Sequence, residues 1–390
     1  MRLTIQNKNY TYLTYQTFPA NTANSIQTIS LIKNCVRIGL DIKLIFPNRS
    51  IDSSGSIEKL KKFYDFQEDF YVEATEHKLP FEGKNANKFS EKIWFNLSHF
   101  LWSKRIVKST LMNERENEKY ITRSDWIFYF LSKANKNVLF ECHQVSKVRK
   151  FVINMIQNKK NSYIVFTNEL LKKEFNIKEN FEANTIILHN GYDDDYFENE
   201  NNSQQEKRAI FVGKLFRFEK ERNIEFLVNA FSDKRLNEYK FTVVGGPDEY
   251  KDILERKMTS NNISNVEFLG NLSRKKAIKE IQKSEIGILV NTDENKHSLL
   301  HTSPIKYFEY LKAKLKVVGV DFPSHRNLPM SDKIIFFENN NKESFINAIL
   351  KAADMNIYDT LDKNVLSISE RTKLIINFFA RPEGLEPPTL

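Results

Sequence analysis

The chain has 390 residues, 41% hydrophobic and 28% charged, which suits two globular domains and argues against a disordered protein. Its formal charge is +9, but the Lys and Arg are spread along the chain without a basic block, which argues against nucleic-acid binding. The two cysteines, Cys35 and Cys142, are far apart and flanked by apolar residues, a pattern typical of reduced, buried thiols in a cytosolic protein.

The sequence gives no sign of a membrane-spanning segment. Residues 1–8 lack the apolar stretch of a signal peptide, and no window approaches about 18 apolar residues. We therefore expect a cytoplasmic protein, which could still lie on the inner face of the cell membrane.

The first half of the chain alternates short apolar runs with helical segments. Residues 10–15 alternate as a strand does, 26–36 carry apolar side chains at helical spacing, and 42–46 form a short buried strand. Further strands are predicted at 138–142, 163–166 and 185–188. Because strand–helix–strand units build parallel sheets, we predict a doubly wound α/β domain over residues 1–198.

A polar stretch precedes a second series of the same kind. Residues 199–208 contain no apolar side chain and are interpreted as a linker. The second domain, 209–361, is predicted to contain strands at 209–212, 241–244, 266–268, 286–290, 316–319 and 333–337, and helices at 224–231, 275–282 and 304–311. Two doubly wound domains would place a ligand cleft where the carboxyl ends of their strands face each other.

One candidate phosphate site follows the first strand of the second domain. The strand ends at Gly213, and the residues before the next helix include four cations, Lys214, Arg217, Lys220 and Arg222. Glycine lets the backbone approach a phosphate closely, and clustered cations would neutralise a diphosphate. A charged loop in solvent is an equally good interpretation of this pattern alone. Gly245 ends the next strand, which is weak evidence because many strand–helix turns contain glycine.

A third candidate site lies at the start of the helix predicted at 304–311. Ser303 can cap it and Pro304 suits the first helical position, so the first-turn amides, up to Lys306, could form an anion site. Glu309 lies one to two turns inside this helix, on a face that could reach a sugar hydroxyl.

Together these residues resemble the retaining glycosyltransferases of the GT-B fold, specifically family 4 (glycosyl transferases group 1). The segments that carry the resemblance are 211–215, 222–227, 243–246, 265–270, 303–311 and 317–323. A looser similarity in the first half rests on 18–21, 122–124, 140–143 and 189–193. The resemblance implies two Rossmann-like domains with an interdomain cleft, and a helix at 362–380 that crosses back onto the first domain. The Pro- and Gly-rich residues 381–390 are expected to be a disordered tail.

The resemblance also implies roles for individual residues. Glu309 would hydrogen-bond the nucleotide ribose, and the diphosphate would be held by Lys214 with Lys220 or Arg222, helped by the amides near Ser303. Among these cations Lys220 and Lys214 are ranked ahead of Arg222, which could instead pair with Glu219 or Glu225. His143 would face the transferred sugar, although a histidine after a buried strand is often only a core or rim residue.

No cofactor and no metal are expected. In the usual account of the family, the leaving diphosphate deprotonates the acceptor hydroxyl, and the protein positions groups and stabilises charge. Asp193–Asp195 are interpreted as a solvated loop rather than as metal ligands. Two positions depart from the family pattern: His301 stands where a second glutamate is common, and the first loop has Ala20, Thr22 and Ala23 where paired glycines are common.

The predicted function is transfer of a hexosyl group from a nucleotide-diphosphate sugar to a glycan or lipid-linked acceptor, in surface polysaccharide or lipopolysaccharide biosynthesis. The alternatives are a sugar-nucleotide epimerase of the same fold and a non-catalytic nucleotide-sugar-binding partner subunit, which His301 keeps open. Residues 88–108 combine an apolar stripe with basic residues. They fit a helix lying on an anionic membrane surface or a core helix with a basic solvent face.

Overall fold

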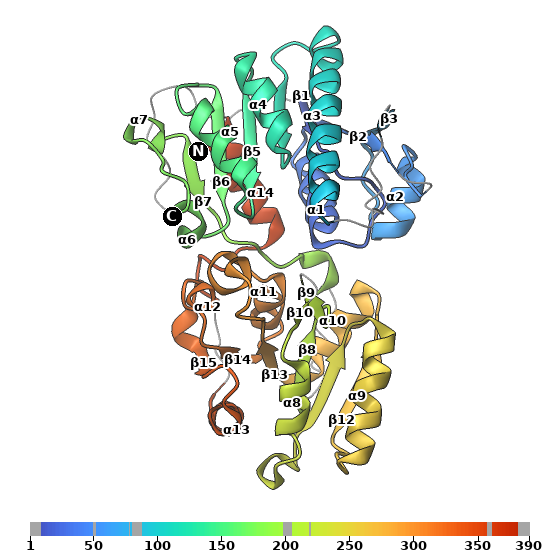
Figure 1. The fold of residues 1–390 in the computed structure, drawn as a ribbon, viewed down its shortest axis with the longest axis vertical. Helices are drawn as coiled ribbons and strands as arrows, with labels where there is room; N and C mark the ends of the chain where they lie inside the picture. Colours follow the sequence, from blue (N-terminus) through green and yellow to red (C-terminus); the bar gives the residue numbers. More distant parts are fainter. Residues whose placement is uncertain are drawn as a thin grey trace. The chain divides into compact units, whose positions relative to one another are not determined.

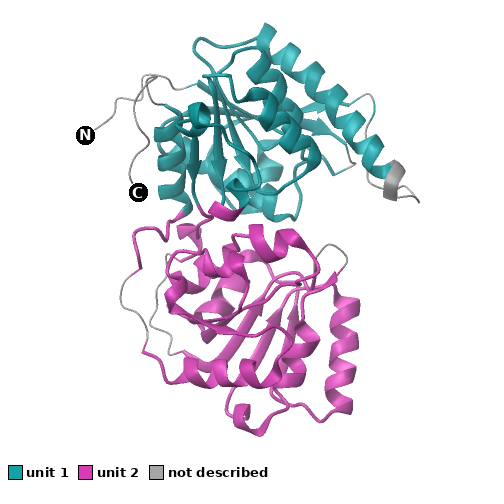
Figure 2. Cartoon of the chain, turned by 60° about the vertical axis from the view of Figure 1, so that its left-hand side comes forward, with its two compact units in different colours: residues 1–167, 171–188, 368–390 teal, residues 168–170, 189–367 magenta. Residues whose placement is uncertain are grey.

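The computed structural model describes residues 9–49, 52–77, 79, 88–197, 205–217, 220–356 and 361–380. The chain divides into two compact units (Figure 2). Unit 1 comprises residues 1–167, 171–188 and 368–390, and unit 2 comprises 168–170 and 189–367. No helix among the described residues has the length and apolar character needed to cross a membrane.

Unit 1 is built on a parallel sheet of seven strands in the order β3-β2-β1-β4-β5-β6-β7 (Figure 1). The strands are β1 (Asn9–Leu13), β2 (Asp41–Asn48), β3 (Tyr71–Glu76), β4 (Lys119–Thr122), β5 (Val138–Cys142), β6 (Ser162–Phe166) and β7 (Thr185–Ile187). Strand β1 pairs with β2 on one side and β4 on the other, so the chain changes direction across the sheet between β1 and β4. This is the topological switch point of a doubly wound sheet, where such folds bind ligands.

The helices of unit 1 include one from the far end of the chain. They are α1 (Ala23–Arg37), α2 (Ile57–Tyr64), α3 (Lys88–Met112), α4 (Asp125–Lys133), α5 (Lys147–Ile156), α7 (Glu179–Glu182) and α14 (Ile368–Phe379), while the short α6 (Glu169–Lys172) lies where the two units divide. Helix α14 packs against α1, and its Phe379 ring meets Tyr10 edge-on with 6.2 Å between the ring centroids. Helix α1 begins with a capping box in which Thr22 and Ser25 satisfy each other's backbone amides.

Unit 2 is built on a parallel sheet of six strands in the order β12-β11-β8-β13-β14-β15. These strands are β8 (Glu206–Val212), β11 (Lys240–Val244), β12 (Val266–Gly270), β13 (Ser284–Leu289), β14 (Lys316–Val320) and β15 (Ile334–Phe337). A small antiparallel hairpin, β9 (Phe216–Arg217) with β10 (Lys220–Glu221), follows β8. The switch point of this sheet lies between β8 and β13.

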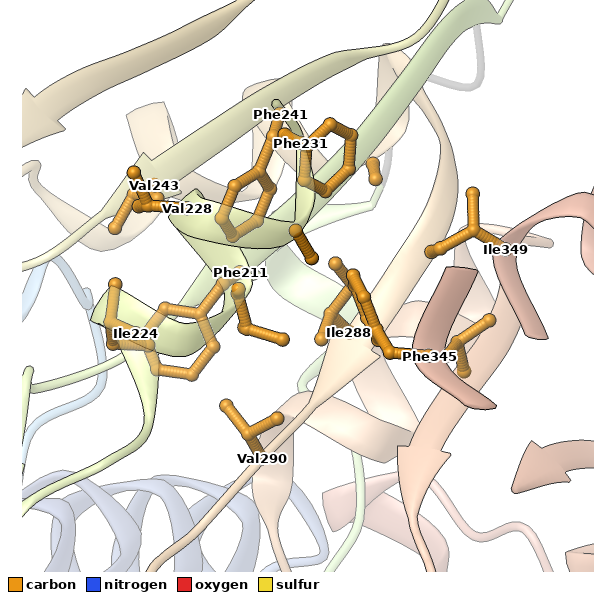
Figure 3. Close-up of a cluster of buried hydrophobic side chains, with 14 of the residues drawn as sticks. Phe211, Ile224, Val228, Phe231, Phe241, Val243, Ile288, Val290, Phe345 and Ile349 are labelled. Carbon is orange, nitrogen blue, oxygen red and sulfur yellow. The ribbon is translucent and has the colours of Figure 1, made fainter. Parts of the chain in front are cut away.

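The helical segments of unit 2 cover the sheet and line its core. They are α8 (Ile224–Ala230), α9 (Asp248–Ser260), α10 (Arg274–Gln282), α11 (Ile305–Lys312), α12 (Pro323–Arg326) and α13 (Lys342–Ala353), with the short turns η1 (Asp194–Tyr196), η2 (Lys234–Leu236), η3 (His297–His301) and η4 (Ser331–Lys333). Figure 3 shows a cluster of apolar side chains from α8, α13 and neighbouring strands. Within it, the rings of Phe231 and Phe241 stack with their centroids 4.8 Å apart.

Helix α11 lies unusually close to this sheet. A Cβ atom on Gly287 of β13 would come within 2.4 Å of the Tyr310 ring, so glycine is needed there. The Tyr310 hydroxyl accepts a hydrogen bond from the Val212 amide at 3.1 Å. The helix is therefore fixed at the carboxyl end of β8, where the sequence places its candidate phosphate site.

The predicted fold class, two doubly wound α/β domains, is confirmed, but the division between them is different. Residues 189–197 belong to unit 2 rather than to a first domain ending at 198. Of the predicted linker, 199–204 lie outside the described residues, as does the predicted tail 381–390. The last part of the predicted linker is wrong, because Glu206–Arg208 begin β8. Arg208 is buried and donates to Glu280 at 2.9 Å, a burial that the polar sequence does not indicate.

Candidate active site

The candidate site of unit 2 is built from glycine turns at the carboxyl ends of neighbouring strands. The Gly213 amide donates to the Val244 carbonyl at 2.9 Å, which joins the ends of β8 and β11. The Gly245 amide donates in turn to Gly270 at 2.8 Å, at the end of β12. Three strand ends are thereby held at one edge of the sheet, as the sequence predicts for parallel strands.

The turn at Gly245 requires glycine, and the space beside Gly213 is occupied by a guanidinium. Gly245 has a φ of +144°, and a Cβ atom there would lie 1.8 Å from the Gly213 carbonyl oxygen. A Cβ atom on Gly213 would lie 2.9 Å from Nη1 of Arg222. The edge therefore brings bare backbone and a guanidinium together, which suits close approach of an anionic ligand.

Arg222 spans the switch point. Its Nη2 donates to the Val290 carbonyl at 2.7 Å, just beyond β13, and its Nη1 donates to the Lys214 carbonyl at 3.4 Å, just beyond β8. Its Cζ lies 5.2 Å from the centroid of the Phe211 ring. The suggested pairing of Arg222 with Glu225 does not occur, because Glu225 pairs with Lys257 at 2.6 Å; Glu219 lies outside the described residues.

Two further cations of this loop, Lys220 and Lys214, are exposed. Lys220 is exposed on the β9–β10 hairpin, and its Nζ lies 2.5 Å from Glu294, whose hydrogen bond raises the pKa of the ammonium. Lys214 is exposed directly after Gly213. Arg222 is therefore the more central cation and Lys220 is already paired with an acid, which reverses the order in which the sequence ranks these two. Phosphate binding by Lys214, Lys220 or Arg222 stays a prediction.

One acid in the same loop escaped the sequence analysis. The Glu221 carboxylate accepts hydrogen bonds from the amides of Asn223, at 2.6 Å, and Ile224. Burial raises the pKa of this carboxyl. The amino end of α8 is therefore capped by the protein's own anion, so a ligand phosphate would bind beside it rather than on it.

Glu309 is fully buried and forms two ion pairs. Its Oε1 accepts from Arg274 Nη2 at 3.0 Å, and its Oε2 accepts from Lys306 Nζ at 2.5 Å. Arg274, on α10, was not predicted; the Cζ atom of its guanidinium lies 4.8 Å from the Tyr196 ring centroid. Both cations are more accessible than the acid, with 18% and 28% of their side chains exposed against 1% for Glu309.

The start of α11 differs from the prediction by one residue. Pro304 occupies the N-cap position instead of the first helical position, and no side chain caps the helix. Ser303 therefore does not act as the cap. Its hydroxyl accepts from the Asn190 amide at 3.0 Å and its carbonyl accepts from Asn190 Nδ2 at 2.5 Å, so Ser303 fastens the 189–190 segment to α11. The anion site predicted at these amides stays a prediction.

His301 and the three consecutive aspartates are also less exposed than a loop interpretation implies. His301 ends the π-helical turn η3 and is 2% exposed. Asp193 is also 2% exposed, so the interpretation of Asp193–Asp195 as a solvated loop is wrong at its first residue. Across the described ranges, no group of three or more His, Cys, Asp or Glu side chains could hold a metal ion.

His143 lies in unit 1, directly after β5. Its Nε2 is 3.9 Å from Glu141 Oε1, beyond hydrogen-bonding distance. Burial and the nearby Arg123 lower the pKa of His143 to about 3, so the ring is neutral at physiological pH. Glu141 is fully buried and accepts from Arg123 Nε and Arg371 Nη1, each at 3.0 Å, which holds its pKa well below the usual range.

Comparison with known families decides the class of protein. Residues 193–365 match the family described as glycosyl transferases group 1. Unit 2 therefore carries a glycosyl transferases group 1 domain, and the chain is a glycosyltransferase. The match spans nearly all of unit 2, including both glycine turns, Arg222 and α11. Among curated protein sequences, none matches this glycosyltransferase.

Solved structures share the fold of the whole glycosyltransferase. A glycosyltransferase from Rickettsia africae ESF-5 is 17% identical with a TM-score of 0.60, over 95% of this chain and 94% of that one. HepE from Anabaena, solved with UDP and glucose, is 11% identical with a TM-score of 0.57, over 95% and 94%. WaaG, a glycosyltransferase involved in lipopolysaccharide biosynthesis, is 12% identical with a TM-score of 0.53, over 94% and 95%. At these identities the likeness extends to the fold alone.

Proposed function

We propose that this glycosyltransferase moves a sugar from a nucleotide-diphosphate sugar to a hydroxyl of a glycan or lipid-linked acceptor, with retention of anomeric configuration. The observation that carries the proposal is the Arg222 guanidinium at the switch point of unit 2, between the ends of β8 and β13 and beside Gly213. Ligands of doubly wound sheets bind at this position. The HepE structure, which holds UDP and glucose in a similar fold, supports the donor class.

The chemistry follows from where charge develops. As the bond between the sugar and the phosphate oxygen breaks, negative charge builds on the leaving diphosphate. Arg222 and Lys214 lie where they would stabilise it, with about 3 kcal/mol available from one well-placed donor. The oxygen of the acceptor hydroxyl bonds to the anomeric carbon, and its proton passes to the leaving phosphate oxygen. In this proposal no metal or cofactor takes part.

Glu309 is proposed to bind the ribose of the donor. Each carboxylate oxygen can accept more than one hydrogen bond, so a ribose hydroxyl need not displace both cations. Lys306 is the more exposed of the two partners and is expected to move aside. We expect Glu309→Gln to weaken donor binding about tenfold, since a hydrogen bond to a charged acceptor is lost. Unchanged affinity by calorimetry would remove Glu309 from the site.

The first experiment identifies the donor and then the reaction. A thermal-shift screen against UDP-, GDP- and ADP-sugars finds the nucleotide, because a ligand bound only by the folded state raises the Tm. Incubation with the stabilising donor and a candidate acceptor should then release free nucleotide, and NMR of the product should show the donor's anomeric configuration. Interconversion of the sugar without nucleotide release would favour the epimerase alternative, and binding without any reaction would favour the partner-subunit alternative.

We propose further that the enzyme works at the cytoplasmic face of the membrane in surface-glycan synthesis, a role for which the fold shared with WaaG is supporting evidence. Helix α3 offers the contact surface. Its buried face includes Trp102, whereas four large apolar residues, Ile93, Trp94, Leu97 and Leu101, are 41–53% exposed. The exposed cations Lys104, Arg105 and Lys108 continue the same face. The buried face of α3 fits the core-helix interpretation of 88–108, and its exposed apolar and basic face supports the proposed membrane contact.

Sedimentation with vesicles tests this surface. The chain should pellet with anionic vesicles at low salt and be released at high salt, because screening weakens attraction to the lipid surface. Replacing Trp94 and Leu97 with Ser should reduce pelleting, whereas replacing the exposed Phe63 of α2 should not. No pelleting of the wild-type chain at low salt would rule out the membrane role.

A further inference from the structure

A second polar cluster occupies the carboxyl edge of the sheet in unit 1. Tyr15 follows β1, Arg49 directly follows β2, and His77 directly follows β3. Because these three parallel strands are neighbours, their carboxyl ends meet at one place. Helix α3 lays Ser98 and His99 against them. None of the residues predicted from the sequence to bind the donor belongs to this cluster.

Hydrogen bonds fix the protonation of the cluster. The Tyr15 hydroxyl lies 2.7 Å from Ser98 Oγ and 2.9 Å from His77 Nε2. His77 Nδ1 accepts from the Leu79 amide at 3.2 Å, so a neutral His77 carries its proton on Nε2. The His99 ring stacks on Tyr15 with centroids 4.4 Å apart, and its buried Nε2 has no hydrogen-bond partner in the described part of the chain. Burial and Arg49 lower the pKa of His77 to about 4 and of His99 to about 3.

Arg49 differs from the other buried arginines of unit 1. Arg123 and Arg371 share Glu141, and Arg149 pairs with Asp125 at 2.6 Å. The Arg49 guanidinium instead lies over the Tyr15 ring, with 4.3 Å from Cζ to the centroid, and its buried Nε has no hydrogen-bond partner within the described ranges. Burial lowers the pKa of this guanidinium, and only Tyr15 opposes the effect.

The absence of an acid around Arg49 points to an external anion. A partly buried cation is costly without a counter-charge, and the interactions found for Arg49 among the described residues are with the rings of Tyr15 and Phe95 and with the Tyr15 hydroxyl. The guanidinium fork matches two oxygens of a phosphate or carboxylate. The His77 Nε2–H and the Tyr15 hydroxyl, which lie 2.9 Å apart and bond each other, become further donors only if they turn toward the anion.

We infer that Arg49, with Tyr15, His77 and His99 around it, forms a second oxyanion site that takes a phosphate or carboxylate group of the acceptor. The inference rests on the proposed function, because it assigns unit 1 to the acceptor of the same transfer. The shared chemistry is two or more anionic oxygens, carried either by a free sugar phosphate or acid or by a lipid-linked diphosphate.

Tryptophan fluorescence gives a readout confined to unit 1. The chain has three tryptophans, Trp94, Trp102 and Trp126, and all lie in unit 1. Trp102 belongs to the cluster, with 5.6 Å between its ring centroid and that of Tyr15. Binding at the phosphate site of unit 2 is therefore not expected to move this signal directly.

The titration uses four probes: glucose 1-phosphate, glucuronate, farnesyl diphosphate and neutral glucose. The three anions distinguish a free sugar phosphate, a sugar acid and a lipid-linked diphosphate, and at least one should give a saturable change that glucose does not. We expect Arg49→Gln to weaken that binding about tenfold or more, since a charged hydrogen-bond donor is lost. Arg37→Gln is the matched control, because Arg37 already pairs with Glu68 at 2.5 Å in the same unit.

Four measurements test this site. Arg49→Lys retains the charge without the fork, so it should bind better than Arg49→Gln and worse than wild type; equal affinity in all three chains would overturn the site. So would glucose binding as tightly as the anions. Thermal melting checks that each variant folds. Nucleotide release to water from the donor should be unchanged in Arg49→Gln. Loss of release in this variant would assign Arg49 to the donor and overturn the acceptor site, whereas a wild-type chain that releases no nucleotide from any donor would overturn the proposed function.

Discussion

Both sheets end in polar carboxyl edges, but the edges are made from different parts of the chain. In unit 2 the strand ends carry Gly213 and Gly245, and backbone lies open where a Cβ atom would collide with its neighbours. In unit 1 the strand ends carry large side chains, Tyr15, Arg123 and His143. The first edge can bring a ligand against the backbone, whereas the second can contact one only through side chains.

The cations of the two edges are also held differently. Arg123 and Arg371 share the buried Glu141 carboxylate, which neutralises one of their two positive charges inside unit 1. Arg222 of unit 2 donates to the carbonyls of Val290 and Lys214, which orient the guanidinium at the switch point of the sheet. Removing Glu141 should therefore affect mainly the fold of unit 1, whereas removing Arg222 should affect mainly ligand binding at the edge of unit 2.

The largest test of this contrast is Glu141→Gln. The variant leaves two buried guanidinium groups without their shared acid, so unit 1 should lose about 3–5 kcal/mol of unfolding free energy. Urea unfolding followed by tryptophan fluorescence measures this unit. Asp69→Asn, which breaks the exposed pair with Lys61, should cost no more than about 1 kcal/mol. Equal costs for the two variants would contradict the structural role of the buried cluster.

The difference in unfolding free energy between wild type and Glu141→Gln should depend on pH. The pKa of Glu141 is lowered in the folded state, so its stabilisation is complete above the unfolded value of about 4.3 and is lost as the pH falls toward the folded value. The stability difference between wild type and Glu141→Gln should be steady from about pH 8 to pH 5 and shrink below about pH 4. A difference that grows on acidification would assign the effect to another group.

Arg222→Gln should affect the reaction more than the fold. Losing a donor aimed at the leaving group should lower turnover about 10²–10³-fold, with a much smaller change in donor affinity, because the charge grows as the bond breaks. The comparison is Lys220→Gln, which removes a cation already paired with Glu294 and should change turnover less than about threefold. If Lys220→Gln proves the more damaging variant, the order predicted from sequence is right and the geometric one is wrong.

Gly245→Ala tests the bare backbone of unit 2 with the smallest expected effect. The added Cβ would lie 1.8 Å from the Gly213 carbonyl oxygen, so we expect a loss of about 2–3 kcal/mol from unit 2. Gly39→Ala in unit 1 is the control: Gly39 has a φ of +84°, but an added Cβ would meet no described atom within 4 Å, so only the backbone cost of about 1 kcal/mol remains. Calorimetry reports both, and equal costs would show that crowding at Gly245 is relieved by small movements.

Buried strands and glycine turns could be predicted from the sequence, because one apolar run or one glycine is enough to indicate each of them. Strand β11 is buried along nearly its whole length and reads as an apolar run, and Gly245 leaves a mark because no other residue fits its turn. Strand β3 was missed because its YVEATE sequence is only half-buried and mixes charged with apolar residues. Arg208 was read as linker because a buried arginine looks like an exposed one until its partner Glu280 is known.

The site residues divide in the same way. Lys214 and Glu309 stand in local motifs, whereas Arg274 reaches Glu309 from another helix and no local pattern joins them. The cluster around Arg49 is assembled from three strand ends and α3, so its members are far apart in the sequence and form no local motif. Local patterns therefore predict the residues of a turn, and only the topology brings together residues that come from several turns.

The position of α14 sets an order of events during synthesis. Its Arg371 pairs with Glu141, and Ile375, Ile376 and Phe379 are buried in unit 1, yet the ribosome makes this helix after every residue of unit 2. Unit 2 has therefore emerged completely while unit 1 still exposes the apolar surface that α14 covers. A nascent chain stopped before α14 presents that surface to chaperones and proteases, and the first half of the molecule is the last to be finished.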